Sequence, residues 1–434
     1  MATTSPASHS PLRLPHLALT GYLPYELVMA AAREAGWHGR LRKYDPWLCR
    51  WGLVAQALWA NAAQFRVGAL LAAASGIDLS PGSGAFCRAR RRLSVGFLVR
   101  LVGHLAGLSR EQIQPGGPRR LLLDGGCLGL LDSAANQARF PQSKCHKPGC
   151  GFPRLHFVAL LDLDTGALVD ARLGPLDVHD AVLARPLWDV LRPGDLIIAD
   201  RGFSGWGFRS GMDRREVYYV VRQNGRRRNL TPLPGRRDHR REHWARPKRY
   251  PDWWDADGPA ELAVRVVRER LSSTTTLVLN TNLPASWRTA EVVALYRARW
   301  RVETRFLEFK VLLAAEPLRA KHPATAEQVF WAWVIAYNLV CCLLCETARE
   351  HGQARYRLSC GAALDALAAA PLLAEQEPER CGKWVRQQIA GHLLPRRRKQ
   401  HRDEPRALKQ WHRAYSRLTK PREKYREHGR SRVA

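Results

Sequence analysis

The chain has 434 residues, of which 46% are hydrophobic. This length is enough to bury a substantial core without disulfides or structural metals, which excludes a disulfide-stapled miniprotein and a wholly disordered chain. The charge is unusual, because 69 Lys and Arg residues against 39 Asp and Glu residues leave a formal net charge of +30. Such an excess favours a polyanionic partner, with nucleic acid the first candidate and an anionic membrane surface the second.

The cellular compartment is indicated by the N-terminus and the cysteines. The first residues contain no apolar segment of signal-peptide length, and the ten cysteines form no even framework, which predicts reduced thiols in a cytosol. Cys145, His146 and Cys150 lie close together but have no second ligand pair at zinc-finger spacing, so an ordinary turn is favoured over zinc. The apolar run 329–345 contains Asn338 and favours a buried core helix over a membrane span.

The first quarter of the chain predicts a helical domain. Residues 1–20 are rich in Pro and Ser and are expected to be loose, whereas 21–115 carry apolar residues at helical spacing. Ser83 can cap a helix that presents a cluster of basic side chains, which would suit a small helical DNA-binding module. A solvated basic helix face is an equally good interpretation of that cluster, which consists of Arg88, Arg90, Arg91 and Arg92.

After residue 115 the spacing of apolar residues changes from a helical pattern to short apolar runs, which are typical of an α/β structure. Two strands surround the turn at Asp164, and short apolar runs that each end in an acid predict further strands. A helix between them makes a crossover, so 116–222 is predicted to form the first part of an α/β core. The expected elements are strands at 119–124, 154–174 (two strands), 195–200 and 217–223, and a helix at 180–191.

The second half begins with a basic segment. Residues 223–287 are predicted to form a β-rich insertion, and Arg222 to Tyr250 hold eleven Lys or Arg residues against two acids. Its clustered candidates for DNA contacts are Arg226, Arg227 and Arg228. Residues 288–350 are expected to complete the core, starting with one long helix at 289–313. Residues 351–434 are expected to form a helical C-terminal region and a basic tail.

Three acids stand out against this basic background. Asp124 and Asp200 each end an apolar strand, and ligands bind at the carboxyl ends of strands in α/β sheets. Glu303 lies on the expected long helix. Three converging carboxylates can hold two Mg²⁺ ions, which activate the attacking hydroxyl and stabilise the leaving oxygen in phosphoryl transfer. The alternatives are Asp-initiated turns at both strand ends and a solvated helix face at Glu303.

The helix adds a geometric argument. Tyr296, Arg299, Glu303 and Lys310 are offset by 0, 3, 7 and 14 residues, which at about 100° per residue places them within an arc of about 60°. One helix face would then present a carboxylate for metal beside a phenol and two cations for DNA phosphates. Trp300 borders this face, and core packing is expected for it.

Taken together, these motifs resemble the DDE transposases of bacterial insertion sequences. The insertion-sequence-four group is marked by Tyr-(2)-Arg-(3)-Glu-(6)-Lys, and the four helix residues meet that spacing without a gap or substitution. The segments IIADRGF around Asp200 and LLLDGG around Asp124 resemble the group's second- and first-aspartate motifs. One departure is Gly126, where many relatives have Thr.

The resemblance implies a ribonuclease-H-like catalytic core interrupted by a β-rich insertion, between a helical N-terminal DNA-binding domain and a helical C-terminal region. It implies that Asp124, Asp200 and Glu303 are catalytic and bind two Mg²⁺ ions, for which Mn²⁺ can substitute. Tyr296, Arg299 and Lys310 would then grip phosphates near the cut.

The implied activity is metal-dependent cut-and-paste transposition of an insertion sequence. It comprises end-specific DNA binding, strand cleavage through a hairpin and strand transfer into target DNA. The implied partners are double-stranded DNA, as inverted-repeat ends and as target, and a second copy of the chain in a homodimer on paired ends. We expect a bacterial cytoplasmic, nucleoid-associated protein with no membrane partner.

Two alternatives remain. A catalytically inactive or domesticated protein could bind transposon ends without cutting them. Another DNA nuclease on the same core could use two metal ions without pairing or joining ends. Cutting of terminal-repeat DNA in Mg²⁺, followed by joining, separates the three functions.

Overall fold

The structure is a computed structural model, and its side chains are described only in part within some helices and strands. The segments that it describes are 17–40, 42–58, 64–75, 83–113, 118–223, 230–232, 240–245, 259–273, 275–309, 318–374, 378–395, 420–421 and 424. The predictions for Arg226, Arg227, Arg228 and Lys310, and for most of the N-terminus and basic tail, therefore fall outside the described residues.

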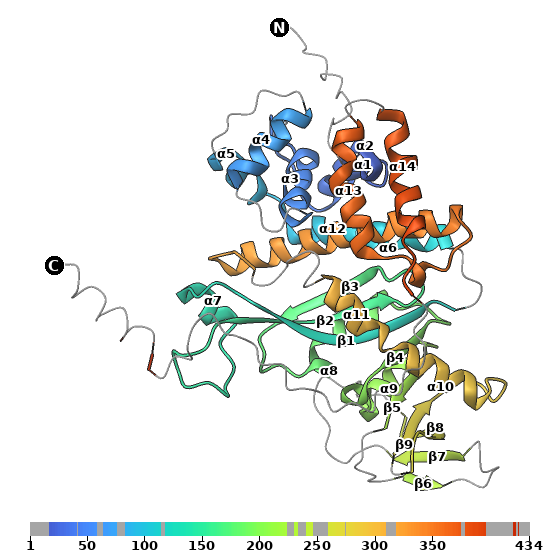
Figure 1. The fold of residues 1–434 in the computed structure, drawn as a ribbon. Coiled ribbons are helices and arrows are strands. Elements are labelled where there is room, and N and C mark those ends of the chain that lie inside the picture. Colours follow the sequence, from blue (N-terminus) through green and yellow to red (C-terminus); the bar gives the residue numbers. More distant parts are fainter. Residues whose placement is uncertain are drawn as a thin grey trace.

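The first quarter of the chain is helical, as its spacing predicted. Its elements are α1 (Leu17–Thr20), α2 (Tyr25–Glu34), α3 (Pro46–Leu58), α4 (Gln64–Ser75), α5 (Ser83–Arg90) and α6 (Val95–Ile113). Helices α3 and α6 pack on α12 (Pro323–Glu350). Figure 1 shows α6 and α12 side by side, with a sheet on one side and the other helices of this group, which α13 (Cys360–Ala374) and α14 (Pro378–Gly391) complete, on the other.

The apolar run 329–345 lies in α12 and is a core helix. Its 18-residue apolar window is entirely buried inside the protein. The Asn338 side chain accepts a hydrogen bond from the backbone N–H of Leu168 at 2.9 Å and donates to the carbonyls of Leu168 and Val102. A buried amide needs such partners. Asn338 therefore joins α12 to the sheet and to α6, and the prediction of a buried helix is confirmed.

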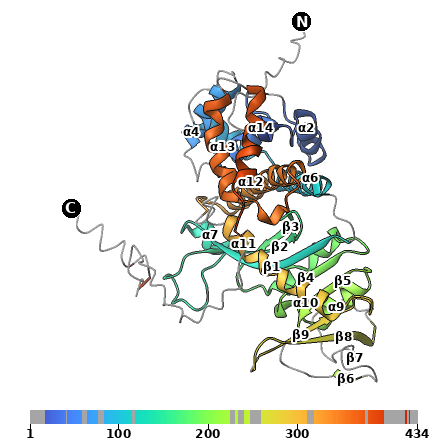
Figure 2. The ribbon, with the colours of Figure 1, turned by 45° about the vertical axis from the view of Figure 1, so that its right-hand side comes forward.

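The central sheet has the mixed α/β character that the sequence predicted. Three strands, β1 (Arg120–Gly129), β4 (Leu196–Ala199) and β5 (Tyr218–Arg222), run parallel to one another. Strand β2 (Arg154–Asp162) pairs antiparallel with β1 on one edge and with β3 (Leu168–Gly174) on the other. One face of the sheet packs on α6 and α12. The other is covered by α8 (Asp180–Leu183), the 3₁₀ helix η1 (Arg185–Val190) and α9 (Trp206–Asp213). Figure 2 shows α6 and α12 on one side of the sheet and α9 on the other.

The basic segment extends the same sheet. Its strands are β6 (Leu230–Pro232), β7 (Arg240–Ala245), β8 (Glu261–Arg270) and β9 (Thr276–Thr281). The described strands form one nine-stranded sheet in the order β3-β2-β1-β4-β5-β9-β8-β7-β6. Strand β9 pairs antiparallel with β5. The basic segment thus prolongs the sheet beyond β5.

The long helix expected at 289–313 is interrupted, so the prediction of one continuous helix was wrong. The chain forms α10 (Thr289–Ala298) and α11 (Arg301–Leu307). Between them the Arg299 N–H bonds to the Tyr296 carbonyl at 3.0 Å, and the Val302 N–H bonds to the Arg299 carbonyl at 2.9 Å. Bonds to the third residue back tighten the helix to about three residues per turn. The uniform angle of about 100° per residue therefore does not hold between Tyr296 and Glu303.

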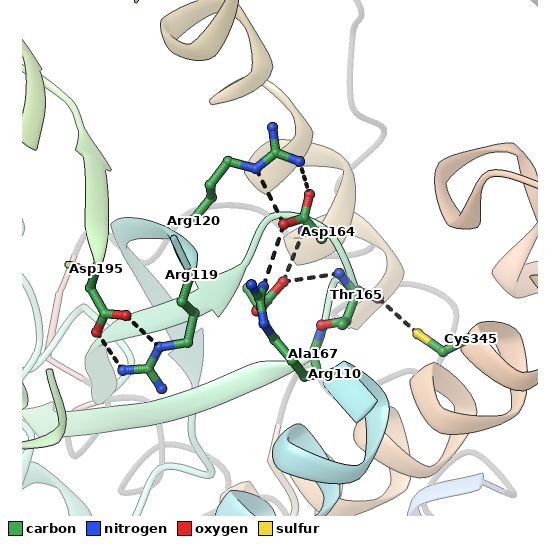
Figure 3. A network of polar contacts seen from close by, with 9 residues as sticks. Arg110, Arg119, Arg120, Asp164, Thr165, Ala167, Asp195 and Cys345 are labelled. Atoms are coloured by element: carbon green, nitrogen blue, oxygen red, sulfur yellow. Dashed lines mark hydrogen bonds and ion pairs between the residues drawn. The ribbon is translucent and has the colours of Figure 1, made fainter. Parts of the chain in front are cut away.

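A network of ion pairs anchors the beginning of β1 (Figure 3). Arg119 pairs with Asp195 through two contacts, and Arg120 pairs with Asp164. Arg110 from α6 donates to Asp162 Oδ2 at 2.9 Å. These contacts tie β1 to the start of β4 and to the β2–β3 turn. The start of the strand that carries Asp124 is therefore fixed on both sides.

Candidate active site

The two predicted aspartates lie side by side. Strands β1 and β4 pair in parallel up to Leu123, which stands opposite Ala199. Asp124 and Asp200 are the next residues of the two strands, so they occupy matched positions. Adjacent strands lie about 4.8 Å apart, and side chains at matched positions leave the same face. The apolar runs that end in these acids thus deliver both carboxylates to one place.

Each aspartate also makes the local turn contact that the alternative interpretation predicted. Asp124 Oδ1 accepts the backbone N–H of Gly125 at 2.9 Å, and Asp200 Oδ1 accepts the N–H of Gly202 at 2.7 Å. Asp200 caps the short 3₁₀ helix η2 (Arg201–Phe203). These bonds orient the carboxylates. Each bond uses only Oδ1 of the carboxylate. An aspartate that forms such a turn can therefore still bind a metal ion through its other oxygen.

The Asp124 carboxylate is electrostatically strained. Burial raises its pKa to about 6, with further contributions from the negative charges of Asp200 and Asp180. The Gly125 N–H and the Arg299 guanidinium oppose this rise. Arg299 Nη1 lies 3.2 Å from Asp124 Oδ2. Among the described residues, Arg299 is the cation that contacts this pair of carboxylates. Two adjacent carboxylates favour additional positive charge, and hard oxygen ligands suit Mg²⁺.

Glu303 lies on α11, which packs against β1. Its side chain is outside the described part of the molecule, as is all of Lys310. Among the side chains that are described, no three His, Cys, Asp or Glu residues are grouped closely enough to hold a metal ion. The approach of α11 to β1 is compatible with a trio, and convergence of the three carboxylates stays a prediction.

Arg299 connects the helix break to Asp124. Its guanidinium lies 5.8 Å from the centre of the Tyr296 ring and 5.5 Å from that of Trp300. Tyr296 is nearly buried, and burial raises the pKa of its hydroxyl, so the phenol stays neutral. Trp300 is 59% exposed, so the expectation of core packing for it was wrong. The tightened turn at Arg299 and Trp300 carries the indole to the surface beside Arg299.

The basic cluster of α5 is divided. Arg88, Arg91 and Arg92 are exposed. Arg90 is only 9% exposed and lies against α12, where its carbonyl accepts a hydrogen bond from Gln328. A surface contact to DNA by Arg90 is therefore not compatible with its position, and the grouping of all four arginines on one face was wrong.

Sequence reasoning missed two residues near Asp124. His156 on β2 places Nε2 2.8 Å from Asp180 Oδ1. A Cβ added to Gly125 would lie 2.7 Å from Asp180 Oδ2, so this carboxylate packs directly on the Gly125 backbone. The sequence features that could have indicated this contact are Gly125 and Gly126, which follow Asp124, and Asp180, the first residue of α8. They are too far apart in sequence to be connected by pattern alone.

A groove of about 1260 Å³ runs along α10 and α11. Arg301 lies over the ring of Tyr356 at 4.6 Å, and that ring is 52% exposed. Burial and the neighbouring Arg305 lower the pKa of Arg301. Trp300 and Arg357 also line the groove, and Arg357 Nη1 is buried with no hydrogen-bond partner in the described structure. Arginines and exposed aromatic rings are the groups that bind single-stranded nucleic acid.

Comparison with known proteins agrees with this geometry. The family model described as the transposase DDE domain matches residues 117–339, which is more than half of the chain. The chain therefore belongs to the DDE transposases, enzymes that cleave DNA and transfer strands. It is 24% identical over 351 residues to the transposase InsG for insertion sequence element IS4 from Escherichia coli (strain K12), with 76% of each chain covered.

Proposed function

We propose that this transposase moves its insertion sequence by a cut-and-paste route, using Asp124, Asp200 and Glu303 as the catalytic carboxylates. The observation that carries the proposal is the matched position of Asp124 and Asp200 on β1 and β4, with α11 packed against β1. One end of the element would be nicked, and the freed 3′-hydroxyl would form a hairpin by attacking the opposite strand. The reopened end would then join target DNA.

We infer that the three carboxylates hold two divalent cations, Mg²⁺ by preference, with Mn²⁺ as a substitute. The strained charge of Asp124 beside Asp200 supports this, and the oxygen donors suit a hard cation. Bound there, the ions lower the pKa of attacking water and stabilise the leaving oxygen. Arg299, which pairs with Asp124 in the protein alone, would be free to hold a DNA phosphate once cations supply the charge.

The sheet supports a ribonuclease-H-like core. An antiparallel β1–β2–β3 unit followed by β4 and β5 parallel to β1, with helices on both faces, is the arrangement expected of such a core. In the proposed layout the β6–β9 segment is the insertion, and α1–α6 form the DNA-binding domain.

DNA binding is proposed for several surfaces. The exposed Arg88, Arg91 and Arg92 would contact phosphates of the element end. Arg226, Arg227 and Arg228 are likewise proposed to contact DNA. Lys310 is proposed to bind a phosphate near the cut. Tyr296 is nearly buried, so its ring would pack against the Arg299 guanidinium and hold it in place. A homodimer would pair the two ends, and the DNA substrate would place the protein on the bacterial nucleoid.

The test uses a plasmid that carries the coding region with its own flanking DNA, incubated with purified protein in Mg²⁺ or in EDTA. The proposal predicts excision at both flanks, hairpin ends that renature at once after denaturation, and insertion into a second plasmid. An Asp124→Asn variant should do none of these. Binding without cutting would support the inactive end-binding alternative, and cutting that ignores the flanks would support a plain two-metal nuclease.

A further inference from the structure

We infer that His156 and Asp180 are a positioning pair for Asp124, acting through the backbone of Gly125. The inference rests on the proposed role of Asp124 as a metal ligand. Neither residue belongs to the acidic trio or to the four-residue helix motif. The pair would set the orientation of the first catalytic carboxylate from behind the strand.

The pair is held firmly. His156 is 7% exposed on β2, and its Nε2 lies 2.8 Å from Asp180 Oδ1. Its Nδ1 is buried and has no hydrogen-bond partner among the described groups. Asp180 is therefore the polar anchor of the imidazole. Asp180 is the first residue of α8. The preceding residue, His179, caps this helix by accepting the Ala181 N–H at 3.1 Å, and the cap fixes where the helix begins.

The contact from Asp180 to the strand requires glycine. Asp180 Oδ2 would lie only 2.7 Å from an ideal Cβ at position 125, closer than real Cβ contacts allow, so any larger residue there would have to displace this carboxylate. Gly125 in turn donates its N–H to Asp124 Oδ1 at 2.9 Å. Gly125 is in register with Val158 on β2, whereas the pairing of β1 with β4 ends at Leu123. On the β4 edge this peptide therefore has no strand neighbour in register, and the Asp180 carboxylate adds a contact to it.

The geometry assigns Asp180 a supporting role and not that of a direct ligand. Successive side chains of a strand point to opposite faces. Leu121 and Leu123 belong to the core on the α8 side, and Gly125 shares their face, whereas Asp124 shares the face of Leu122. Asp180 thus stands behind the strand from which Asp124 projects. Helix α8 also packs on η2, which directly follows Asp200, so the pair supports both aspartates.

The experiment compares Asp180→Ala and Asp180→Asn with Asp177→Ala in the full-length protein. Asp177 is a matched control, because it is a more exposed carboxylate three residues away that pairs with Lys144 at 3.4 Å. The readouts are the cleavage rate at saturating DNA, the DNA dissociation constant, the melting temperature, and Mn²⁺ binding measured by electron paramagnetic resonance on the uncut DNA complex.

We expect Asp180→Ala to lower the cleavage rate and the Mn²⁺ affinity by about 10- to 100-fold, as for other residues that orient metal ligands, with DNA affinity within twofold of wild type. Asp180→Asn keeps a side-chain oxygen that can accept a hydrogen bond from His156, so it should retain most of the cleavage rate and most of the Mn²⁺ affinity. Asp177→Ala should match wild type. Wild-type Mn²⁺ affinity in Asp180→Ala, or an equal loss in Asp177→Ala, would overturn the inference.

Two safeguards keep the outcomes distinct. If Asp180→Ala does not fold, the comparison is made between Asp180→Asn and His156→Gln, and wild-type Mn²⁺ affinity in His156→Gln then contradicts the pair. If the wild-type protein cuts no DNA, the proposed function fails, but the Mn²⁺ measurements still decide whether His156 and Asp180 orient Asp124.

Discussion

Asp124 and Asp200 stand at matched positions on two parallel strands, one residue beyond the last paired residues Leu123 and Ala199. The short length of β4 produces this relationship, because its pairing with β1 stops where the two acids begin. Carboxylates this close repel each other, and Arg299 is the one cation seen in contact with Asp124 among the described residues. A cation bound between the two carboxylates would therefore relieve their mutual repulsion.

Removing the negative charge of the trio should separate binding from catalysis. Asp124→Asn, Asp200→Asn and Glu303→Gln preserve side-chain size while weakening the metal ligands. We expect each to bind DNA within about threefold of wild type and to cleave at least about a thousandfold more slowly. Gel-shift and cleavage assays on the same DNA measure both. Wild-type cleavage by Glu303→Gln would remove Glu303 from the site.

The raised pKa of Asp124 predicts a specific dependence of stability on pH. A folded-state pKa of about 6 lies above the ordinary value of 3.8, so the folded protein binds a proton more tightly than the unfolded chain. The free energy of unfolding therefore falls as pH rises from about 4 to about 6, by on the order of 2–3 kcal/mol from this group, and then levels off.

The check compares wild type with Asp124→Asn without metal. Asn keeps the shape and lacks the charge, so the variant should be the more stable at pH 7 and should lose this advantage near pH 4. Denaturant titrations in EDTA at several pH values measure it. Parallel pH profiles for the two proteins would mean that Asp124 is not strained in the folded state.

Arg299 should affect both DNA and Asp124. Arg299→Ala removes a cation proposed to hold a phosphate, so we expect weaker DNA binding and a plot of log affinity against log salt that is shallower by about one. Lys310→Ala should act in the same direction. Arg299→Lys, which keeps the charge, is the matched control. Unchanged salt slopes for both alanine variants would show that these side chains do not contact phosphate.

The groove along α10 and α11 should bind a single DNA strand. Arg301→Ala and Tyr356→Ala remove a guanidinium and an exposed ring that face each other at 4.6 Å. We expect each to weaken binding of a duplex with a single-stranded overhang by about tenfold, and only Arg301→Ala to flatten its salt dependence. Fluorescence anisotropy measures both quantities.

The control for the groove is Arg100→Ala, which removes an exposed arginine already paired with Glu34 at 3.0 Å. It should leave affinity for the overhang unchanged. An equal effect of Arg301→Ala on blunt and overhanging duplexes, with no effect of Tyr356→Ala, would argue against a single strand in the groove.

The sequence allowed the strands and their terminal acids to be predicted, because apolar runs that end in Asp are local patterns. The break at Arg299 and Trp300 was not predictable from helical spacing, since no Pro or Gly marks it. It accompanies a contact from Arg299 to Asp124, 175 residues away. Local propensity does not contain such a tertiary interaction.

Long-range contacts also explain what was missed near the site. Asp180 meets Gly125, and Arg301 meets Tyr356, across 55 residues in each case. Arg90 lies within the same basic cluster as Arg88, but it is buried: its guanidinium donates to Gln56 on α3, and its carbonyl accepts from Gln328 on α12. A basic cluster predicts charge, whereas the face that each arginine occupies depends on which helix covers it.

A metal-preference switch at Glu303 tests most directly whether this carboxylate binds the catalytic metal ions. In Glu303→Cys a soft thiolate replaces the carboxylate, and softer metals than Mg²⁺ accept sulfur more readily. Cleavage of the flanked plasmid is measured in Mg²⁺ and in Mn²⁺, with Thr304→Cys as the neighbouring control. If Glu303 binds the metal, Glu303→Cys should be inactive in Mg²⁺ and regain cleavage in Mn²⁺, whereas Thr304→Cys should cleave like wild type in both. Wild-type cleavage by Glu303→Cys in Mg²⁺ would contradict metal binding by Glu303.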